Sequence, residues 1–99
     1  MAQVSLSDKD GRTTIRIHGD FVFALNREFR DVYQSLPPGR PVTVDLSGAS
    51  YIDSAGLGML VRLREHQGGE RRSVTLQGAN PTIRNILEVA NFGQLFVIE

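Results

Sequence analysis

Alternating apolar and polar residues at the beginning of the chain predict a pair of strands. Val4 and Leu6 stand two positions apart, and Ile15 and Ile17 repeat this spacing after an Asp-Gly pair. A strand turns every second side chain toward the same face, and Asp-Gly between two such runs favours a tight hairpin turn. The pattern therefore predicts a β-hairpin, which we expect to end at Gly19.

Three later segments carry apolar residues three to four positions apart, the spacing of one helix face. The first ends before a Pro-Pro-Gly run and the second before a Gly-Gly pair, and both sequences stop helices. In the third, Asn80 suits the N-cap and Pro81 the first helical position. The residues expected to share a face are Leu25, Phe29, Val32, Tyr33 and Leu36 in the first helix, Leu57, Leu60, Val61 and Arg64 in the second, and Ile83, Ile86, Leu87 and Ala90 in the third.

Short apolar runs that are typical of strands separate these helices. They cover residues 41–46, 73–77 and 95–98, and a loop is expected over residues 47–50. Because single helices connect them, these strands are expected to lie mostly parallel, with right-handed crossovers. The predicted fold class is α/β: a single domain over residues 1–99, with a mostly parallel central β-sheet, helices packed against it, and the order β-β-α-β-α-β-α-β.

The segment from Asp45 to Gly58 joins the carboxyl end of a strand to the start of a helix, where open α/β sheets usually form their sites. Ser54 stands at or beside the helix N-cap, where unpaired backbone N–H groups and the helix dipole favour negative charge. A phosphate on Ser54 would be tolerated there, although the neighbouring Asp53 opposes it. Gly56 and Gly58 each cost about 1 kcal/mol relative to alanine inside a helix, which makes sense if another group approaches the backbone closely.

Two other interpretations of this segment stay open. In the first, Ser54 or Asp53 only caps the helix, and the glycines permit close packing. In the second, Ser54 is a catalytic nucleophile, which requires a base and an oxyanion site. The surrounding sequence lacks the G-x-S-x-G pattern of a nucleophile elbow, and no base stands out, so catalysis is not expected.

The same segment resembles the signature of the STAS family, which comprises anti-sigma-factor antagonists and related bacterial regulators. Val44-Asp45-Leu46 matches the strand of that signature, and Asp53 to Gly58 matches the D-S-x-G-L-G turn that follows it. The run over residues 78–87 and the tail with Phe92 and Leu95-Phe96 also fit. The resemblance covers essentially the whole chain and implies a STAS-like fold of the stand-alone anti-sigma-factor antagonist type.

The resemblance also implies a function. Stand-alone members of this type are phosphorylated, on the serine that matches Ser54, by a partner serine kinase that is often also the anti-sigma factor. A metal-dependent serine phosphatase of the PPM type reverses the reaction. The unphosphorylated form binds the partner and phosphorylation releases it, since a dianion in an interface without a matching cation is strongly unfavourable. The chain is therefore expected to be a phosphoprotein that acts by partner switching in signal transduction and transcription regulation.

One stretch departs from the family pattern. Many members carry an acidic residue shortly after the second strand, whereas Val22 stands there in this chain and Asp20 lies two positions early. The apolar run from Phe21 to Phe23 is either core or part of a partner surface. The pattern is closer to stand-alone proteobacterial members of two-component pathways, which govern motility, attachment or biofilm formation, than to the sporulation type. The residues expected to bind the partner are Asp20, Tyr51, Asp53, Ser54, Ala55, Gly56, Leu57 and Gly58.

Composition argues against several classes of partner and of site. Eleven basic residues balance eleven acidic ones, which gives no support for a nucleic-acid partner, and the absence of cysteine excludes disulfides and thiol catalysis. His18 and His66 lack ligand-type neighbours, so we expect neither a metal site nor a cofactor. Without a visible signal segment or a long apolar run, no membrane partner is expected and the cytoplasm is the default compartment. A monomer is the simplest expectation, although an exposed edge strand could pair.

A ligand-sensing function remains the alternative. STAS-like domains in transporters and sensor assemblies bind nucleotides or other small molecules, and glycines at a helix start are compatible with an anion. The loop before Ser54 is short, however, and offers little pocket volume.

Overall fold

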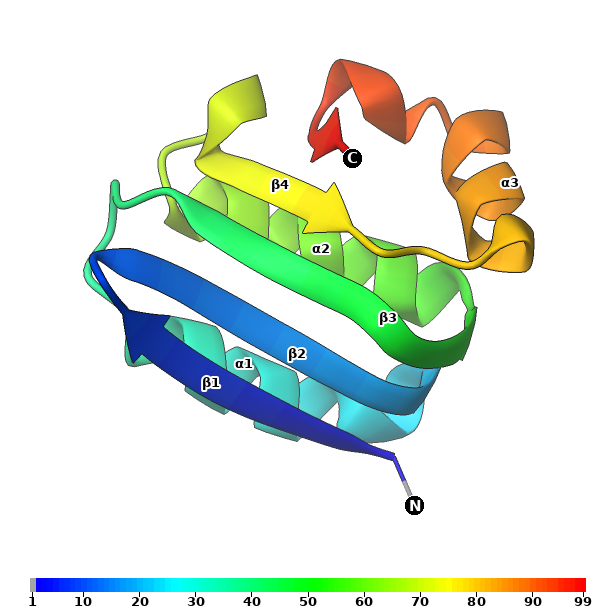
Figure 1. Cartoon of the computed structure of the whole chain (residues 1–99), viewed down its shortest axis with the longest axis horizontal. Coiled ribbons are helices and arrows are strands. Elements are labelled where there is room, and N and C mark those ends of the chain that lie inside the picture. Colours follow the sequence, from blue (N-terminus) through cyan, green and yellow to red (C-terminus); the bar gives the residue numbers. More distant parts are fainter. Residues whose placement is uncertain (1) are drawn as a thin grey trace.

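A five-stranded sheet in the order β1-β2-β3-β4-β5 forms the centre of the fold (Figure 1). β1 is antiparallel to β2, and the other neighbours are parallel, so the predicted α/β class and element order are confirmed. The structure is a computed structural model that describes residues 2–99. The strands are β1 (Gln3–Lys9), β2 (Arg12–Phe21), β3 (Val42–Ile52), β4 (Val74–Gln77) and β5 (Val97–Ile98). The helices are α1 (Asn26–Gln34), α2 (Ser54–His66) and α3 (Pro81–Val89), with short 3-10 turns η1 (Phe23–Leu25), η2 (Arg71–Ser73) and η3 (Phe92–Gln94).

The predicted hairpin is present, but its second strand is longer than expected. Asp10 and Gly11 form the two-residue turn, with φ of 54° and 76°. β2 does not end at Gly19: it continues to Phe21, whose side chain is fully buried. Gly19 instead adopts a φ of 81° beside a register shift in the pairing with β3, so the glycine bends the strand without ending it.

The expected loop over residues 47–50 is wrong, because β3 runs on through these residues to Ile52. Ala49 and Ile52 are buried and pair with the extended part of β2. A Cβ at Gly48 would lie only 2.6 Å from the Nδ1 atom of His18, so a glycine is needed where the two strands come close. Small residues that resemble a loop in the sequence therefore build a tightly packed strand.

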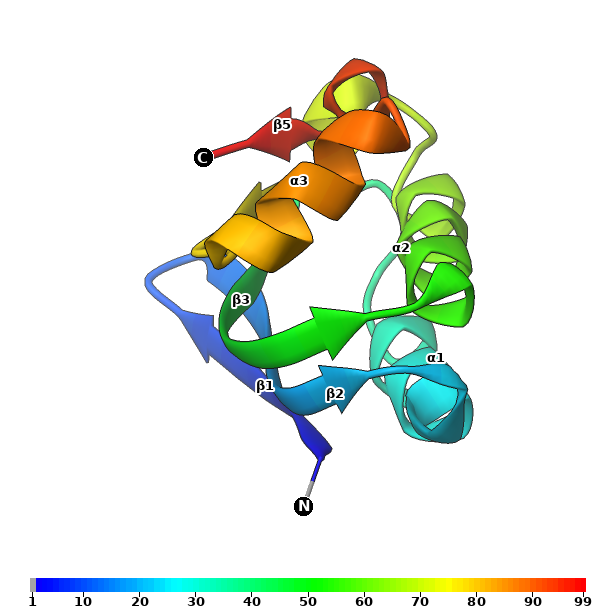
Figure 2. The same ribbon diagram turned by 90° about the vertical axis from the view of Figure 1, so that its right-hand side faces the viewer.

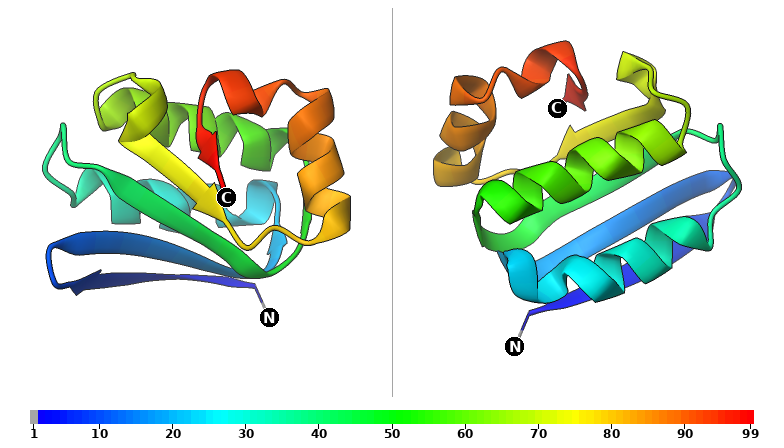
Figure 3. Two further views of the ribbon diagram at one scale, coloured as in Figure 1. Left: turned by 45° about the horizontal axis from the view of Figure 1, so that its top comes forward. Right: turned by 180° about the vertical axis from the view of Figure 1, so that it is seen from behind.

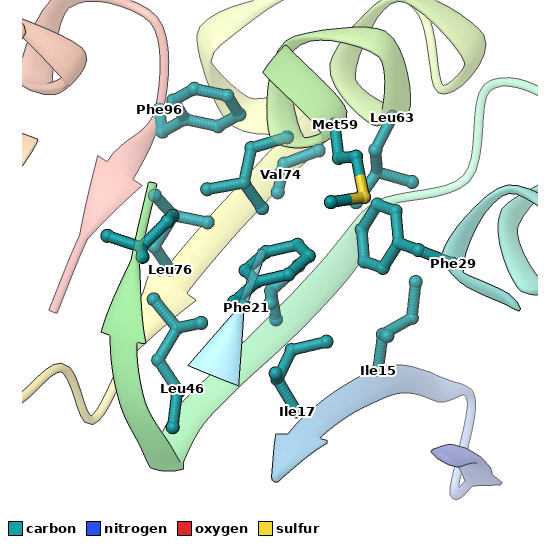
Figure 4. Close-up of a cluster of buried hydrophobic side chains, with 14 of the residues drawn as sticks. Ile15, Ile17, Phe21, Phe29, Leu46, Met59, Leu63, Val74, Leu76 and Phe96 are labelled. Carbon is teal, nitrogen blue, oxygen red and sulfur yellow. The ribbon is translucent and has the colours of Figure 1, made fainter. Parts of the chain in front are cut away.

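Two helices cover one face of this sheet. α1 and α2 lie side by side behind the strands of Figure 1, and they are seen in front of the sheet in the right-hand view of Figure 3. α3 lies apart from them, past the carboxyl end of β4 in Figure 1, and β5 pairs with β4. Figure 2 shows α3 and β5 near each other, away from α1. The helices and the sheet enclose a core in which Phe21 and Phe29 contact each other at a ring distance of 5.1 Å (Figure 4).

The buried face of α2 differs from the prediction. Leu60 is buried as expected, but its buried neighbours on the helix are Gly56, Met59 and Leu63, whereas Leu57, Val61 and Arg64 are only partly buried. In α1, Phe29 and Tyr33 are buried as predicted, and in α3 so are Ile83 and Leu87. α3 stops at Val89, which leaves Ala90 exposed as its C-cap.

Asn80 caps α3 as the sequence predicts. Its Oδ1 atom accepts a hydrogen bond of 2.8 Å from the backbone N–H of Ile83, and Pro81 occupies the first helical position. Over residues 2–99, no helix combines the length and apolar character needed to span a bilayer.

Candidate functional site

The ends of β2 and β3 meet the start of α2 in one turn. The backbone N–H of Asp53 donates to the Phe21 carbonyl at 3.4 Å, which ties the residue after β3 to the last residue of β2. Asp53 has an extended backbone, with φ −105° and ψ −175°, and its Oδ1 atom accepts a 2.8 Å hydrogen bond from the N–H of Gly56. Asp53 is therefore the N-cap of α2, and Ser54 is the first helical residue.

This division leaves the Ser54 hydroxyl free. Ser54 is exposed, and among the residues that the structure describes its side chain forms no hydrogen bond. The first turn of the 13-residue helix α2 presents backbone N–H groups and the positive end of the helix dipole to the same place. A negatively charged group on Ser54 would be favoured by the helix and opposed by the carboxylate of Asp53.

The two glycines of the signature turn have different surroundings. A Cβ at Gly56 would overlap the Phe21 carbonyl oxygen and would lie 2.7 Å from the Cγ1 atom of Ile52. A Cβ at Gly58 would meet nothing closer than the Arg62 guanidinium, 3.7 Å away. Gly56 therefore permits close packing of α2 on the end of β2, whereas no such contact accounts for Gly58.

Exposed and half-buried residues of three segments lie near the edge of the sheet where α2 begins. The Cα atoms of Asp20 and Tyr51 pair across β2 and β3, and both residues are exposed, Tyr51 to 46%. Ala55 and Leu57 are half-buried on the first turns of α2. The residues expected to bind a partner therefore lie at the ends of β2 and β3 and on the first turns of α2, except that Gly56 is buried against β2 and is not part of an exposed surface.

The apolar run after Asp20 is divided between core and surface. Phe21 is fully buried, whereas Phe23 is 70% exposed, and Val22 lies between these extremes. The sequence leaves both interpretations open for this run and gives no reason to single out Phe23. Phe23 comes shortly after Phe21, whose carbonyl accepts the Asp53 N–H, and apolar patterning alone could not reveal that its ring is exposed there.

A side chain from α3 braces the same region. The Nδ2 atom of Asn80 donates to the carbonyls of Ala49 and Ser50, each at 3.3 Å, while its Oδ1 atom caps α3. The sequence predicts the cap but not the bridge to β3. One asparagine therefore fixes the start of α3 to the end of the strand that leads to Ser54.

Asp45 of the signature strand takes part in another network. Its carboxylate accepts hydrogen bonds from the Nε atom of Arg16 at 3.0 Å and from the N–H of Ser47 at 2.9 Å. Burial alone would raise the pKa of Asp45, but these hydrogen bonds and the charge of Arg16 hold the pKa below its usual value. The carboxylate therefore stabilises the sheet and does not contact Ser54.

Nothing that the structure describes at the Ser54 turn suggests a ligand pocket or a metal site. A surface hollow of about 320 Å³ is lined by residues of the hairpin turn, the start of β3, β4 and Glu99, and another of about 350 Å³ is lined by hairpin residues. No residue of the Ser54 turn lines either of them. Within residues 2–99, no cluster of three His, Asp or Glu side chains could hold a metal ion. His66 is hydrogen-bonded to Gln67, at 2.6 Å, and not to Ser54.

Comparison with known proteins decides the family. The family model described as "Mlab, STAS domain" matches residues 4–99. The chain belongs to the STAS family. A "STAS-domain containing protein" of Pseudomonas aeruginosa (strain UCBPP-PA14) is 46% identical over 101 residues, which cover 99% of each chain.

Solved structures confirm the STAS fold. An anti-sigma factor antagonist from Mycobacterium paratuberculosis superposes with a TM-score of 0.81 at 20% identity, over 99% of this chain and 85% of the other. The anti-sigma factor antagonist SpoIIAA in its unphosphorylated form gives a TM-score of 0.78 at 16% identity, over 98% and 88% of the two chains. At these identities the likeness establishes a shared fold.

Proposed function

We propose that this STAS protein is a phosphorylation-controlled protein-binding module of the anti-sigma-factor antagonist type, with Ser54 as the phosphoacceptor. One observation carries the proposal: Asp53 caps α2, so the Ser54 hydroxyl is exposed and unengaged at the first helical residue. A serine that served only as the cap would instead direct its oxygen to a backbone N–H. The fold shared with SpoIIAA, whose structure was solved in the unphosphorylated form, supports the same assignment.

In the unmodified state, the surface around Ser54 would bind a partner serine kinase of the anti-sigma-factor type. Asp20, Phe23 and Tyr51 are exposed near the ends of β2 and β3, the strands that meet the start of α2, and the open position at Gly58 lets another chain approach the helix. Aromatic side chains are enriched in the cores of protein interfaces, which suits this placement of Tyr51 and Phe23.

Phosphorylation would then release the partner. The Ser54 oxygen would bond to the terminal phosphorus of ATP on the kinase, the bond between that phosphorus and ADP would break so that ADP leaves, and the hydroxyl proton would pass to a base of the kinase. The product carries about −2 charge where the partner had docked. The N–H groups at the start of α2 stabilise this charge within the chain. Asp53 adds further negative charge, which repels an acidic partner surface and must be desolvated against an apolar one. A PPM-type phosphatase would hydrolyse the phosphoserine and restore binding.

This proposal makes the chain a regulator and not an enzyme. Because the kinase requires ATP, the module would act in the cytoplasm. Its pathway would control transcription or another process governed by a two-component system.

The test begins with intact mass and peptide mapping of the protein from its native cells. A gain of about 80 Da on the Ser54 peptide is expected, lost in Ser54→Ala. The alanine variant should then retain the kinase partner constitutively, while Ser54→Asp and Ser54→Glu should bind it more weakly. Ser50→Ala is the matched control, because Ser50 is also exposed and lies just before the turn. Equal partner affinity of the alanine and acidic Ser54 variants would contradict the proposal.

A further inference from the structure

β1 leaves one edge of the sheet open. It is an outer strand, and over residues 2–99 nothing pairs with its far side (Figure 1). β5, the other outer strand, has only two residues, whereas β1 has seven. Proteins commonly blunt an edge with a short strand, a bulge, proline or charged side chains. The charged residues of β1, Asp8 and Lys9, stand only at its turn end, and the stretch from Gln3 to Ser7 carries no charge. β1 contains no proline, and its pairing with β2 has no register shift, so its edge is long and regular.

The hairpin turn determines which backbone groups of β1 are unpaired. Asp10 and Gly11 both have positive φ, as in a type I′ turn, so the flanking pair, Lys9 and Arg12, is hydrogen-bonded. Hydrogen-bonded and non-hydrogen-bonded pairs alternate along an antiparallel ladder. The N–H and C=O groups that point away from β2 therefore belong to Val4, Leu6 and Asp8.

The side chains at these positions leave an apolar surface unfinished. Val4 and Leu6 lie opposite Ile17 and Ile15, which are fully buried in the core, so their side chains share the helix-covered side of the sheet. Leu6 is nevertheless 42% exposed because no strand lies beyond it. A neighbouring strand would cover Leu6 and would satisfy the free backbone groups at the same time.

We propose that the strand that completes this edge is β1 of a second copy, which pairs antiparallel with Leu6 opposite Leu6. Leu6 is the midpoint of Gln3–Lys9, so this register overlaps all seven residues of both strands. It sets Val4 opposite Asp8 of the second copy, and all three residues with outward backbone groups exchange hydrogen bonds. Lys9 then lies opposite Gln3, and no like charges oppose each other. The result is one continuous sheet across both copies.

This dimer goes beyond the function proposed for Ser54 and does not depend on it. β2 and β3 lie between β1 and the Ser54 turn, so pairing leaves that turn accessible. Because the paired strands run in opposite directions, the two Ser54 turns face opposite ends of the joined sheet. The pairing departs from the monomer that the sequence led us to expect.

The first experiment is sedimentation equilibrium over a concentration series up to about 1 mM, the weak end of specific association. The expected mass rises from 10.9 kDa toward twice that value. Leu6→Lys should remain monomeric, while Val89→Lys, at an 80% exposed residue of α3, should dimerise normally. Circular dichroism checks that both variants are folded. A chain that stays monomeric throughout overturns the proposal, and an edge reserved for an extended segment of another protein would give that result.

The second experiment tests the register and benefits from a chain without cysteine. Ser5 of one copy should face Ser7 of the other at a non-hydrogen-bonded pair, where Cα atoms lie about 4.5 Å apart and a disulfide is allowed. Mixing Ser5→Cys with Ser7→Cys protein under mild oxidation should give a disulfide-linked pair of the two variants. Ser5→Cys alone should not cross-link efficiently. Efficient cross-linking of Ser5→Cys with itself would overturn the proposed register.

Discussion

Substitution of the two glycines in the first turns of α2 should have opposite effects on stability. Inside a helix, alanine is favoured over glycine by about 1 kcal/mol. At Gly58, where the nearest atom to an added Cβ is 3.7 Å away, this gain should be realised in full. Gly58→Ala should therefore raise the free energy of unfolding by about 0.5–1 kcal/mol.

At Gly56 the same gain is outweighed by overlap. The added Cβ would meet the backbone carbonyl of Phe21, which cannot rotate away as a flexible side chain could, and the Cγ1 atom of Ile52 at 2.7 Å. Forcing one methyl group into a packed region typically costs about 1–3 kcal/mol, and contact with backbone belongs at the upper end. After the helix gain is subtracted, Gly56→Ala should lower the free energy of unfolding by about 2 kcal/mol.

Urea unfolding followed by circular dichroism measures both effects, with equal m-values expected for the two variants. In thermal unfolding, a change of 1 kcal/mol corresponds to about 4–8 °C in Tm for a domain of this size, so the variants should differ clearly. If Gly56→Ala were as stable as Gly58→Ala, the reasoning that α2 rests on the end of β2 through Gly56 would be refuted.

Three further predictions concern the side chains of Asp53, Asp45 and Phe23. Asp53→Ala should lower the free energy of unfolding by about 1 kcal/mol through loss of the α2 cap, while Asp53→Asn should retain most of it; equal losses in urea unfolding would argue against the cap. Because the folded-state pKa of Asp45 is held below 3.8, its ionised form adds stability above that pH, and this contribution should disappear as the pH falls through the lower folded-state pKa. Stability measured from pH 5 to pH 2 should show a flatter fall in Asp45→Asn, and an unchanged slope would contradict the assignment. Phe23→Ser should leave the unfolding free energy within about 0.5 kcal/mol, because the ring is 70% exposed, yet weaken binding to the kinase partner in a titration. Unaltered partner affinity would remove Phe23 from the interface.

The sequence predicted the element order because most segments carry one clear period. The exceptions have physical causes that pattern counting misses. The expected loop over residues 47–50 is a strand because Gly48 and Ala49 are small enough to pack against the bent part of β2. The run of small residues looks like a loop only until the neighbouring strand is known.

The buried face of α2 could not be obtained from hydrophobicity alone. Its inner face begins with Gly56, which contributes no hydrophobicity yet makes the closest contact with β2. Counting apolar residues favoured Leu57 and Val61 and so rotated the predicted face away from Met59 and Leu63. A glycine selected for its small volume leaves no periodic signal.

The candidate site was predictable in part for the same reason. The signature turn located Ser54, but the choice between Ser54 and Asp53 as the cap depends on backbone angles that a sequence does not display. The exposure of Phe23 depends on where β2 ends, and the strand runs two residues past the glycine at which it was expected to stop.

The rigid support of the Ser54 turn has a consequence for cells that contain several STAS proteins with separate partners. The turn is held by the Phe21 carbonyl beneath it and by Asn80 beside it, so a charge added on top has little room to reshape the fold. Phosphorylation would then be sensed only by a protein that contacts the Ser54 turn directly. Discrimination between relatives with the same fold would then depend on a few exposed side chains near the ends of β2 and β3, such as Phe23 and Tyr51. Exchanging these side chains between two relatives should exchange the partners that they bind.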